Sequence, residues 1–122
     1  MAGKNYQDLT TWQEAMNLVE SIYKITKQFP KEEQFCLVTQ LRRAAISVPS
    51  NIAEGQGRRA KKEFSHFLKI AHGSVREIET QLIIARRLQY LDEAVARDVM
   101  EQAGRVDRLI TGLTNSLTDP ED

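Results

Sequence analysis

The chain has 122 residues, 41% of them hydrophobic and 28% charged, a composition typical of one soluble globular domain. No segment approaches the roughly 20 consecutive apolar residues of a membrane span, and no signal peptide is recognisable, so we expect a cytoplasmic protein. The single cysteine, Cys36, excludes an intramolecular disulfide. The 17 basic and 17 acidic residues balance, which excludes a chain that is basic throughout.

The positive charge is nevertheless concentrated in one segment. Residues 42–62 contain six Arg or Lys residues and one acidic residue, Glu54, which gives a net charge of +5. Residues 1–41 carry a net charge of −1 and residues 63–122 carry −4. A local cluster of this size can attract phosphate groups even when the whole chain is neutral.

Apolar residues recur at three- and four-residue spacing along nearly the whole chain, which predicts helices rather than strands. We expect an N-terminal arm at residues 1–8, helices at about 10–29, 31–56, 60–89 and 92–117, and a disordered acidic tail at 118–122. Short connections favour an all-α fold, an antiparallel up-down-up-down four-helix bundle. Pro49 lies within the second helix and should kink it.

The spacing also predicts which residues form the core. In the first helix these are Trp12, Met16, Val19, Tyr23 and Thr26, and in the second Val38, Leu41, Ala45 and Val48. The third helix has the longest stripe: Phe64, Phe67, Leu68, Ala71, Val75, Ile78, Leu82 and Ala85. The fourth offers Val95, Val99, Val106, Leu109, Ile110, Leu113 and Leu117.

Some apolar residues fall away from these stripes at about 100° per residue. They are Leu18 and Ile25 on the first helix and Ile70 and Ile84 on the third. Scattered surface hydrophobic residues are common in monomers. Because two helices each carry a second aligned pair, we predict that these four residues contact another subunit in a homo-oligomer.

Catalytic and metal-binding patterns are weak. Glu63 and His66 match half of a di-iron bundle motif, but Lys69 stands where a second motif ending at His72 would need a carboxylate. Cys36 with either histidine could suggest a nucleophile, but no third group that would orient the histidine is recognisable. We therefore expect no metal site, no cofactor and no enzymatic activity.

The segment GQGRRAKK, residues 55–62, lacks the spacing of a phosphate-binding loop and the strand that precedes a dinucleotide-binding glycine motif. We interpret Gly55 and Gly57 as the residues that reverse the chain through positive φ. The basic residues around them could contact nucleic-acid phosphates: Arg42, Arg43, Arg58, Arg59, Lys61 and Lys62. The alternative is a solvated face with local ion pairs.

Three stretches together resemble a known family. They are YQDLTTWQEAMNLVESIYKITKQFP, QLRRAAISVPSNIAEGQGR and EFSHFLKIAHGSVREIETQLIIARRLQYL, within residues 6–91. The chain is similar to the four-helix-bundle family named for proteins encoded inside intervening sequences of bacterial 23S ribosomal RNA genes. The matching motif positions are Gln40, Arg42, Arg43, Ser47, Pro49, Asn51, Glu54, Gly55, Gly57 and Arg58.

The resemblance implies a cytosolic bundle that assembles into a ring-like homopentamer. Relatives of the family include accessory proteins of diversity-generating retroelements, which bind nucleic acid and associate with a reverse transcriptase. Two positions depart from the family pattern: Ala60 stands where a helix-capping Ser or Thr is usual, and Gln89 where Gly is usual.

Two functions remain open at this point. The first is an oligomeric scaffold that binds structured RNA through the six basic residues. The second is a structural or adaptor homo-oligomer that binds a protein partner without nucleic acid, in which Arg42, Arg43 and Glu54 are internal partners that order the segment around Pro49.

Overall fold

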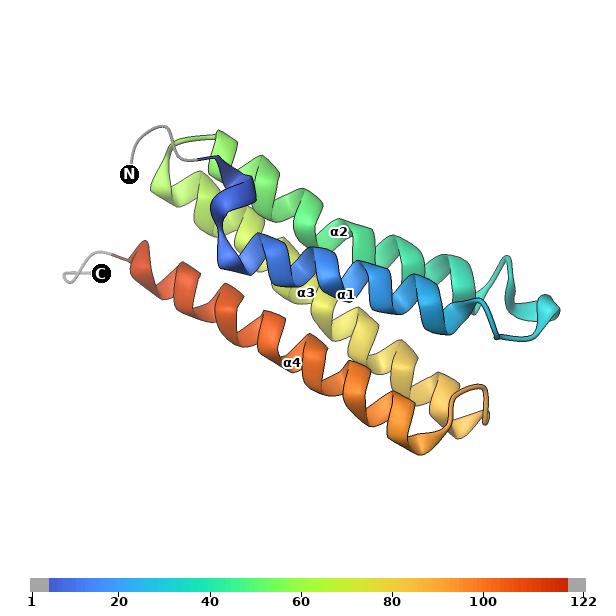
Figure 1. The fold of residues 1–122 in the computed structure, drawn as a ribbon. Coiled ribbons are helices and arrows are strands. Elements are labelled where there is room, and N and C mark those ends of the chain that lie inside the picture. The colour runs from blue at the N-terminus through green and yellow to red at the C-terminus, as the bar shows by residue number, and fades with distance from the viewer. Residues whose placement is uncertain (1–4, 119–122) are drawn as a thin grey trace.

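The computed structural model describes residues 5–118, and these residues form four helices and no strand. The helices are α1 (Thr10–Thr26), α2 (Leu37–Gly57), α3 (Lys61–Arg87) and α4 (Glu93–Ser116). Successive helices run in opposite directions, as the up-down-up-down prediction requires (Figure 1). Two short 3-10 turns, η1 (Tyr6–Asp8) and η2 (Lys31–Glu33), precede α1 and α2. Of the disordered tail predicted at 118–122, residues 119–122 lie outside the described residues, as do residues 1–4 of the predicted arm.

The connection between α1 and α2 is longer than the spacing predicts. The first helix ends at Thr26, three residues short of the predicted end, and α2 begins at Leu37, six residues after the predicted start. Pro30 introduces the 3-10 turn instead of a helix, and Cys36 has a non-helical backbone at φ −124° and ψ −97°. The Glu33 carboxylate accepts a hydrogen bond from the Leu37 N–H at 3.3 Å, which satisfies a free donor at the start of α2.

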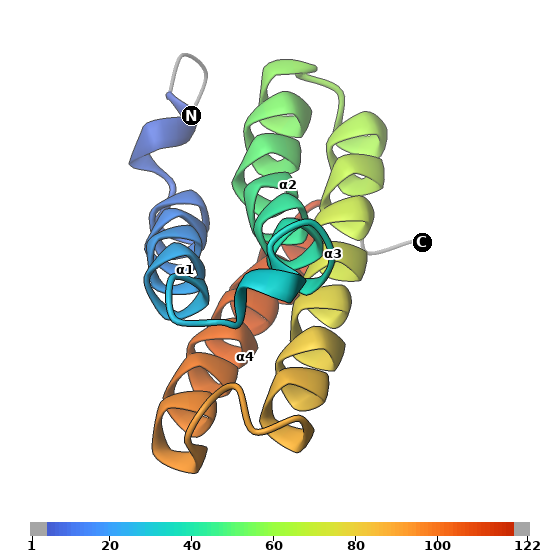
Figure 2. The same ribbon diagram turned by 90° about the vertical axis from the view of Figure 1, so that its right-hand side faces the viewer.

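The core lies between the four helices, and α2 and α3 lie side by side along their length (Figure 2). Six of the predicted α3 residues are buried: Leu68, Ala71, Val75, Ile78, Leu82 and Ala85. In α4 the buried positions are Ala96, Val99, Ala103, Val106 and Ile110, so the prediction was wrong for Val95, which is exposed. Pro49 is buried within an unbroken α2, where it leaves the Ala45 carbonyl without its usual N–H donor.

Four of the five buried positions of α1 lie one residue before the predicted ones, and Thr26 is buried as predicted. The buried residues of α1 are Thr11, Ala15, Leu18, Ile22 and Thr26. The placement of Leu18 at a subunit interface was therefore wrong, because its side chain is fully buried within its own bundle. Ile25 is partly buried and packs against the same core. Trp12, Met16 and Val19 are only partly buried, and they line an open apolar groove beside Ile46 and Pro49 of α2.

The turn between α2 and α3 does not use its glycines as predicted. Gly55 and Gly57 belong to α2, and the residue with positive φ is Arg59, at 69°. Gly55 is needed for space, because a Cβ there would lie 2.8 Å from Phe67 Cβ and 2.9 Å from Phe64 Cδ1. A Cβ at Gly57 would meet nothing within 4 Å.

At the opposite end of the bundle, α3 ends in a Schellman motif. The Tyr90 N–H donates to the Ala85 carbonyl and the Gln89 N–H to the Arg86 carbonyl, with Gln89 at φ 65°. The Tyr90 hydroxyl then donates to the Glu33 carboxylate at 2.9 Å. This hydrogen bond raises the pKa of Tyr90 above its usual 10.0, so its stabilising effect is complete at neutral pH and is lost as the pH rises through the raised pKa.

Among the helices that residues 5–118 form, none combines the length and apolar composition needed to cross a lipid bilayer.

The contacts of Gly55 predict a large difference between two glycine substitutions in one helix. Gly55→Ala should lower the free energy of unfolding by about 1–3 kcal/mol, because the new methyl group forces α2 and α3 apart. Gly57→Ala should leave it unchanged or raise it by up to about 1 kcal/mol, because alanine favours the helix and meets open space. Urea denaturation followed by far-ultraviolet circular dichroism measures both values. Equal effects of the two substitutions would contradict the close packing at Gly55.

Candidate nucleic-acid interface

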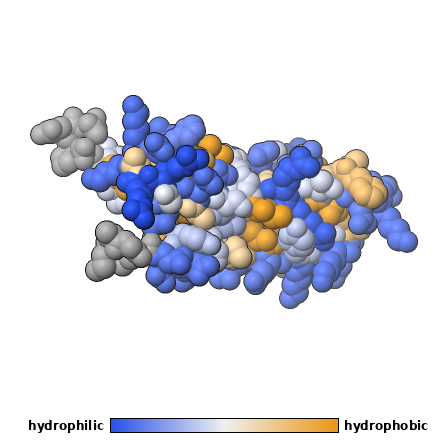
Figure 3. Space-filling view, turned by 90° about the horizontal axis from the view of Figure 1, so that it is seen from above, coloured by the Kyte–Doolittle hydropathy of each residue, from blue (hydrophilic) through white to orange (hydrophobic). Residues whose placement is uncertain are grey.

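The joint between α2 and α3 brings four of the six predicted basic residues to one end of the bundle. Arg58 follows the last residue of α2, Arg59 adopts the left-handed conformation, and Lys61 and Lys62 open α3. All four side chains are exposed. In the space-filling view, the deepest hydrophilic colour gathers at the end where Figure 1 places this turn (Figure 3).

Arg58 is partly engaged by its own neighbours. Its guanidinium donates to the Glu54 carboxylate at 2.9 Å and lies 5.2 Å from the centre of the Phe67 ring. Both charged side chains are about half exposed, so the pair contributes little stability. Arg58 is therefore oriented by these contacts but remains accessible to a ligand.

The first turns of α3 and the end of α4 enclose a polar hollow of about 590 Å³ beside this joint. Its lining residues are Lys61, Lys62, Ser65, His66, Lys69, Leu117 and Thr118. Lys62 and Lys69 make no hydrogen bond or ion pair with another residue in the range 5–118. Ala60 precedes the helix without a side-chain cap, so the positive end of α3 faces the same region.

Lys69 and His66 were not among the predicted contact residues. Their spacing held a signal, because Lys62, Ser65, His66 and Lys69 are three, four and seven residues apart and so lie on one helical face. Leu117 and Thr118 line the hollow only because the end of α4 packs beside α3, and the spacing of residues within α3 does not reveal this packing.

Arg42 belongs to a different part of the molecule. Its Nε donates to Thr26 Oγ1 at 3.0 Å, its Nη2 reaches the Tyr23 carbonyl at 3.4 Å, and its guanidinium lies 4.4 Å from the centre of the Tyr23 ring. It therefore ties the end of α1 to α2. The hypothesis of an internal role for Arg42 agrees with these contacts, although its partners are at the end of α1 and not around Pro49.

Arg43 is exposed and makes no contact of this kind with the described residues. Fifteen residues separate it from Arg58 on one helix, which corresponds to roughly 22 Å at about 1.5 Å per residue. The six predicted basic residues thus divide into a cluster of four, one internal residue and one distant residue.

A second charged cluster joins the middles of α3 and α4. Asp107 Oδ1 lies within hydrogen-bonding distance of His72 Nδ1, at 2.6 Å. Its other oxygen, Oδ2, lies 3.3 Å from Arg76 Nη2. Arg76 also donates a hydrogen bond to the Glu79 carboxylate at 2.7 Å. Glu79 and Asp107 together raise the pKa of Arg76 above its usual value. Asp107 of α4 thus contacts two residues of α3, so this cluster serves the contact between the helices. Within the described part of the chain, no group of three or more His, Cys, Asp or Glu residues could hold a metal ion.

Of the four predicted interface residues, only those on α3 are exposed. Ile70 has 40% and Ile84 41% of its surface accessible. Ile46 of α2, which was not predicted, is 44% accessible. The exposed isoleucines are therefore Ile70 and Ile84 on α3 and Ile46 on α2, whereas the predicted pair on α1 is buried or partly buried.

The contacts of Arg42 predict that it contributes to stability. Arg42→Ala should lower the free energy of unfolding by about 1–3 kcal/mol, because it removes a charged hydrogen bond and a cation–π contact. The adjacent Arg43→Ala, which removes an exposed side chain, should change it by less than about 0.5 kcal/mol. Urea denaturation of the two variants tests this difference. Indistinguishable unfolding curves would exclude an anchoring role for Arg42.

A solved structure and a family model both resemble this chain. No curated protein matches the chain. A crystal structure of a protein of unknown function from the S23 ribosomal protein family of Bacteroides thetaiotaomicron is similar, with a TM-score of 0.80 at 19% identity over 86% of this chain and 95% of that one. Residues 7–112 match the family model described as 23S rRNA-intervening sequence protein. This match covers most of the helical bundle, and the chain therefore belongs to the 23S rRNA-intervening sequence protein family.

Proposed function

We propose that this chain is a non-enzymatic, homo-oligomeric scaffold that binds structured RNA through the basic joint between α2 and α3. The observation that carries the proposal is the convergence of Arg58, Arg59, Lys61 and Lys62 with Lys69 beside a polar hollow of about 590 Å³. Basic side chains around a polar hollow suit phosphate groups, because they neutralise charge without requiring a base sequence.

The conformation of Arg59 supports a role for its side chain. A residue with a Cβ costs roughly 1–2 kcal/mol in the left-handed conformation, where glycine costs nothing comparable. Arg59 occupies such a position at φ 69° with an exposed side chain. Residues held in unfavourable backbone conformations are concentrated at functional sites, so an arginine here favours a function that needs its charge.

Self-association would strengthen this weak local site. One chain has no net charge, so the attraction of the joint for a polyanion is limited to short range. The homopentamer that the family resemblance implies would present the joint five times. We propose that the isoleucines exposed on the single chain make the contacts between subunits. They are Ile46, Ile70 and Ile84.

Binding of a protein partner without nucleic acid is the second candidate. It is favoured by Arg42, whose contacts lie within the bundle, and by the pairing of Arg58 with Glu54. On this alternative the basic joint is a solvated surface, and its substitution leaves RNA retention unchanged.

The two left-handed residues provide a matched test of RNA binding. Arg59→Gly and Gln89→Gly should each raise the free energy of unfolding by about 1 kcal/mol, because each relieves the same backbone conformation. Only Arg59→Gly should weaken binding to a structured RNA hairpin and reduce the salt slope of log K by about 1. Filter binding at several salt concentrations measures both quantities. Equal RNA affinity of the two variants, or wild-type binding that is absent or independent of salt, would refute the proposal.

The exposed isoleucines predict the effect of charge on assembly. Ile84→Asp should shift the protein toward the 13.9 kDa single chain, because it places a charge in the proposed contact. Val95→Asp, at an exposed apolar residue of α4, should leave the assembly unchanged. Light scattering measures the mass of each species. A wild-type protein of 13.9 kDa would exclude the oligomer, and dissociation by both variants would exclude this choice of surface.

A further inference from the structure

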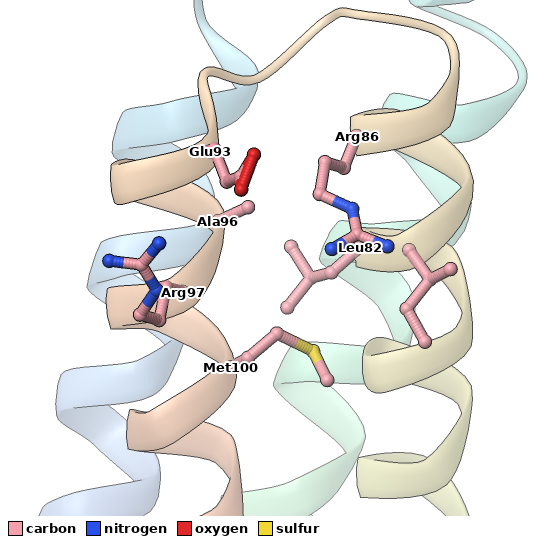
Figure 4. Close-up of a pocket in the computed structure, with 7 residues that line it drawn as sticks. Leu82, Arg86, Glu93, Ala96, Arg97 and Met100 are labelled. Atoms are coloured by element: carbon pink, nitrogen blue, oxygen red, sulfur yellow. The ribbon is translucent and has the colours of Figure 1, made fainter.

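A separate pocket of about 320 Å³ lies between the last turns of α3 and the first turns of α4. The loop that joins the two helices crosses beside it, and the lining side chains come from both helices (Figure 4). Between Lys61 and Arg86 α3 extends over roughly 37 Å at about 1.5 Å per residue, so the pocket is remote from the basic joint. An inference about this pocket is therefore independent of the function proposed above.

The floor of the pocket is apolar. Leu82 and Ala96 are buried in the bundle, and Ile83 and Met100 are partly buried beside them. The short side chain of Ala96 leaves space opposite the leucine. Methionine adapts its shape to different apolar groups, so this floor suits a small aliphatic side chain.

The mouth of the pocket carries both signs of charge. Arg86 comes from α3, and Glu93 and Arg97 come from α4 (Figure 4). The Glu93 carboxylate is directed into the space between the helices, toward the side on which Arg86 lies. None of these three exposed side chains forms a hydrogen bond or ion pair with any residue between 5 and 118. Their hydrogen-bonding capacity is therefore available to a ligand.

We propose that this pocket binds a free α-amino acid with an aliphatic side chain. The side chain lies on the floor formed by Leu82, Ile83 and Met100. The ligand's carboxylate accepts hydrogen bonds from the Arg86 guanidinium, which projects into the space between the helices, and its ammonium group donates to Glu93 (Figure 4). Such a zwitterion complements the Arg86 guanidinium, the Glu93 carboxylate and the apolar floor together.

Other occupants fit these features less well. A fatty acid could pair its carboxylate with Arg86, but it carries no cation for Glu93, whose charge would repel that carboxylate. An amphipathic helix needs anchor positions over several turns, whereas the pocket spans only residues 82–86 and 93–100 and is bounded by the loop. A volume near 320 Å³ is at the lower end of the roughly 300–1,000 Å³ typical of small-molecule sites.

Three related compounds test the proposal on the full chain. L-leucine has all three recognised groups, 4-methylpentanoate lacks the ammonium group, and 3-methylbutylamine lacks the carboxylate. Titration followed by amide NMR should show saturable shifts at residues 82–100 for leucine, with an affinity at least about tenfold above that of either analogue. Absence of saturable binding at millimolar concentration, or equal binding of 4-methylpentanoate, would overturn the proposal.

Substitutions inside and outside the pocket distinguish binding in the pocket from a general effect of charge on leucine affinity. Arg86→Gln and Glu93→Gln should each weaken leucine binding about tenfold, and Ala96→Leu should abolish it by filling the space above the floor. Arg87→Gln removes an exposed charge that does not line the pocket and should leave the affinity unchanged. The melting temperatures of the two arginine variants should match. A loss of leucine affinity in Arg87→Gln equal to that in Arg86→Gln would contradict the assignment.

Discussion

The close contact between α2 and α3 is the constraint on which the rest of the structure depends. Gly55 allows the α2 backbone to lie against Phe64 and Phe67, and farther along the pair the hydroxyls of Ser47 and Ser74 are 2.8 Å apart. Small residues at both places allow the two helices to pack closely along much of their length. Because the helices are already close where α2 ends, the chain must reverse within a few residues. That reversal places Arg59 in the left-handed conformation and gathers the basic residues at one end.

The other helices are attached to this pair by polar as well as apolar contacts. Arg42 fastens the end of α1 to α2 through Thr26 and Tyr23, and the cluster of His72, Arg76 and Asp107 joins α3 to α4. These contacts explain why several charged residues that look available in the sequence are occupied in the fold. The joint between α2 and α3 is the place where four exposed basic side chains gather at one end of the bundle.

The sequence predicted the fold well because the stripe on α3 is long and regular. It placed the α1 stripe one residue too far along, since the large side chains of Trp12 and Met16 suggested the core, whereas Ala15 and Leu18 occupy it. The role of Gly55 could not be predicted, because its reason is the phenylalanine side chains of another helix. Arg42 could be recognised as part of a motif, but only the packing of α1 showed that it points inward. Lys69 could have been found from helical spacing, whereas the pocket at Arg86 and Glu93 arises from how two helices meet.

The central claim, that the basic joint is the surface for a polyanion, is tested most directly by amide hydrogen exchange with and without a structured RNA hairpin at low salt. Residues on the exposed end of the bundle should exchange more slowly when RNA is bound, because the RNA covers this end and limits its opening. The account predicts that added protection is concentrated at residues 57–69 and is absent at residues 82–100. Protection elsewhere with none at the joint, or no change on adding RNA, would contradict it.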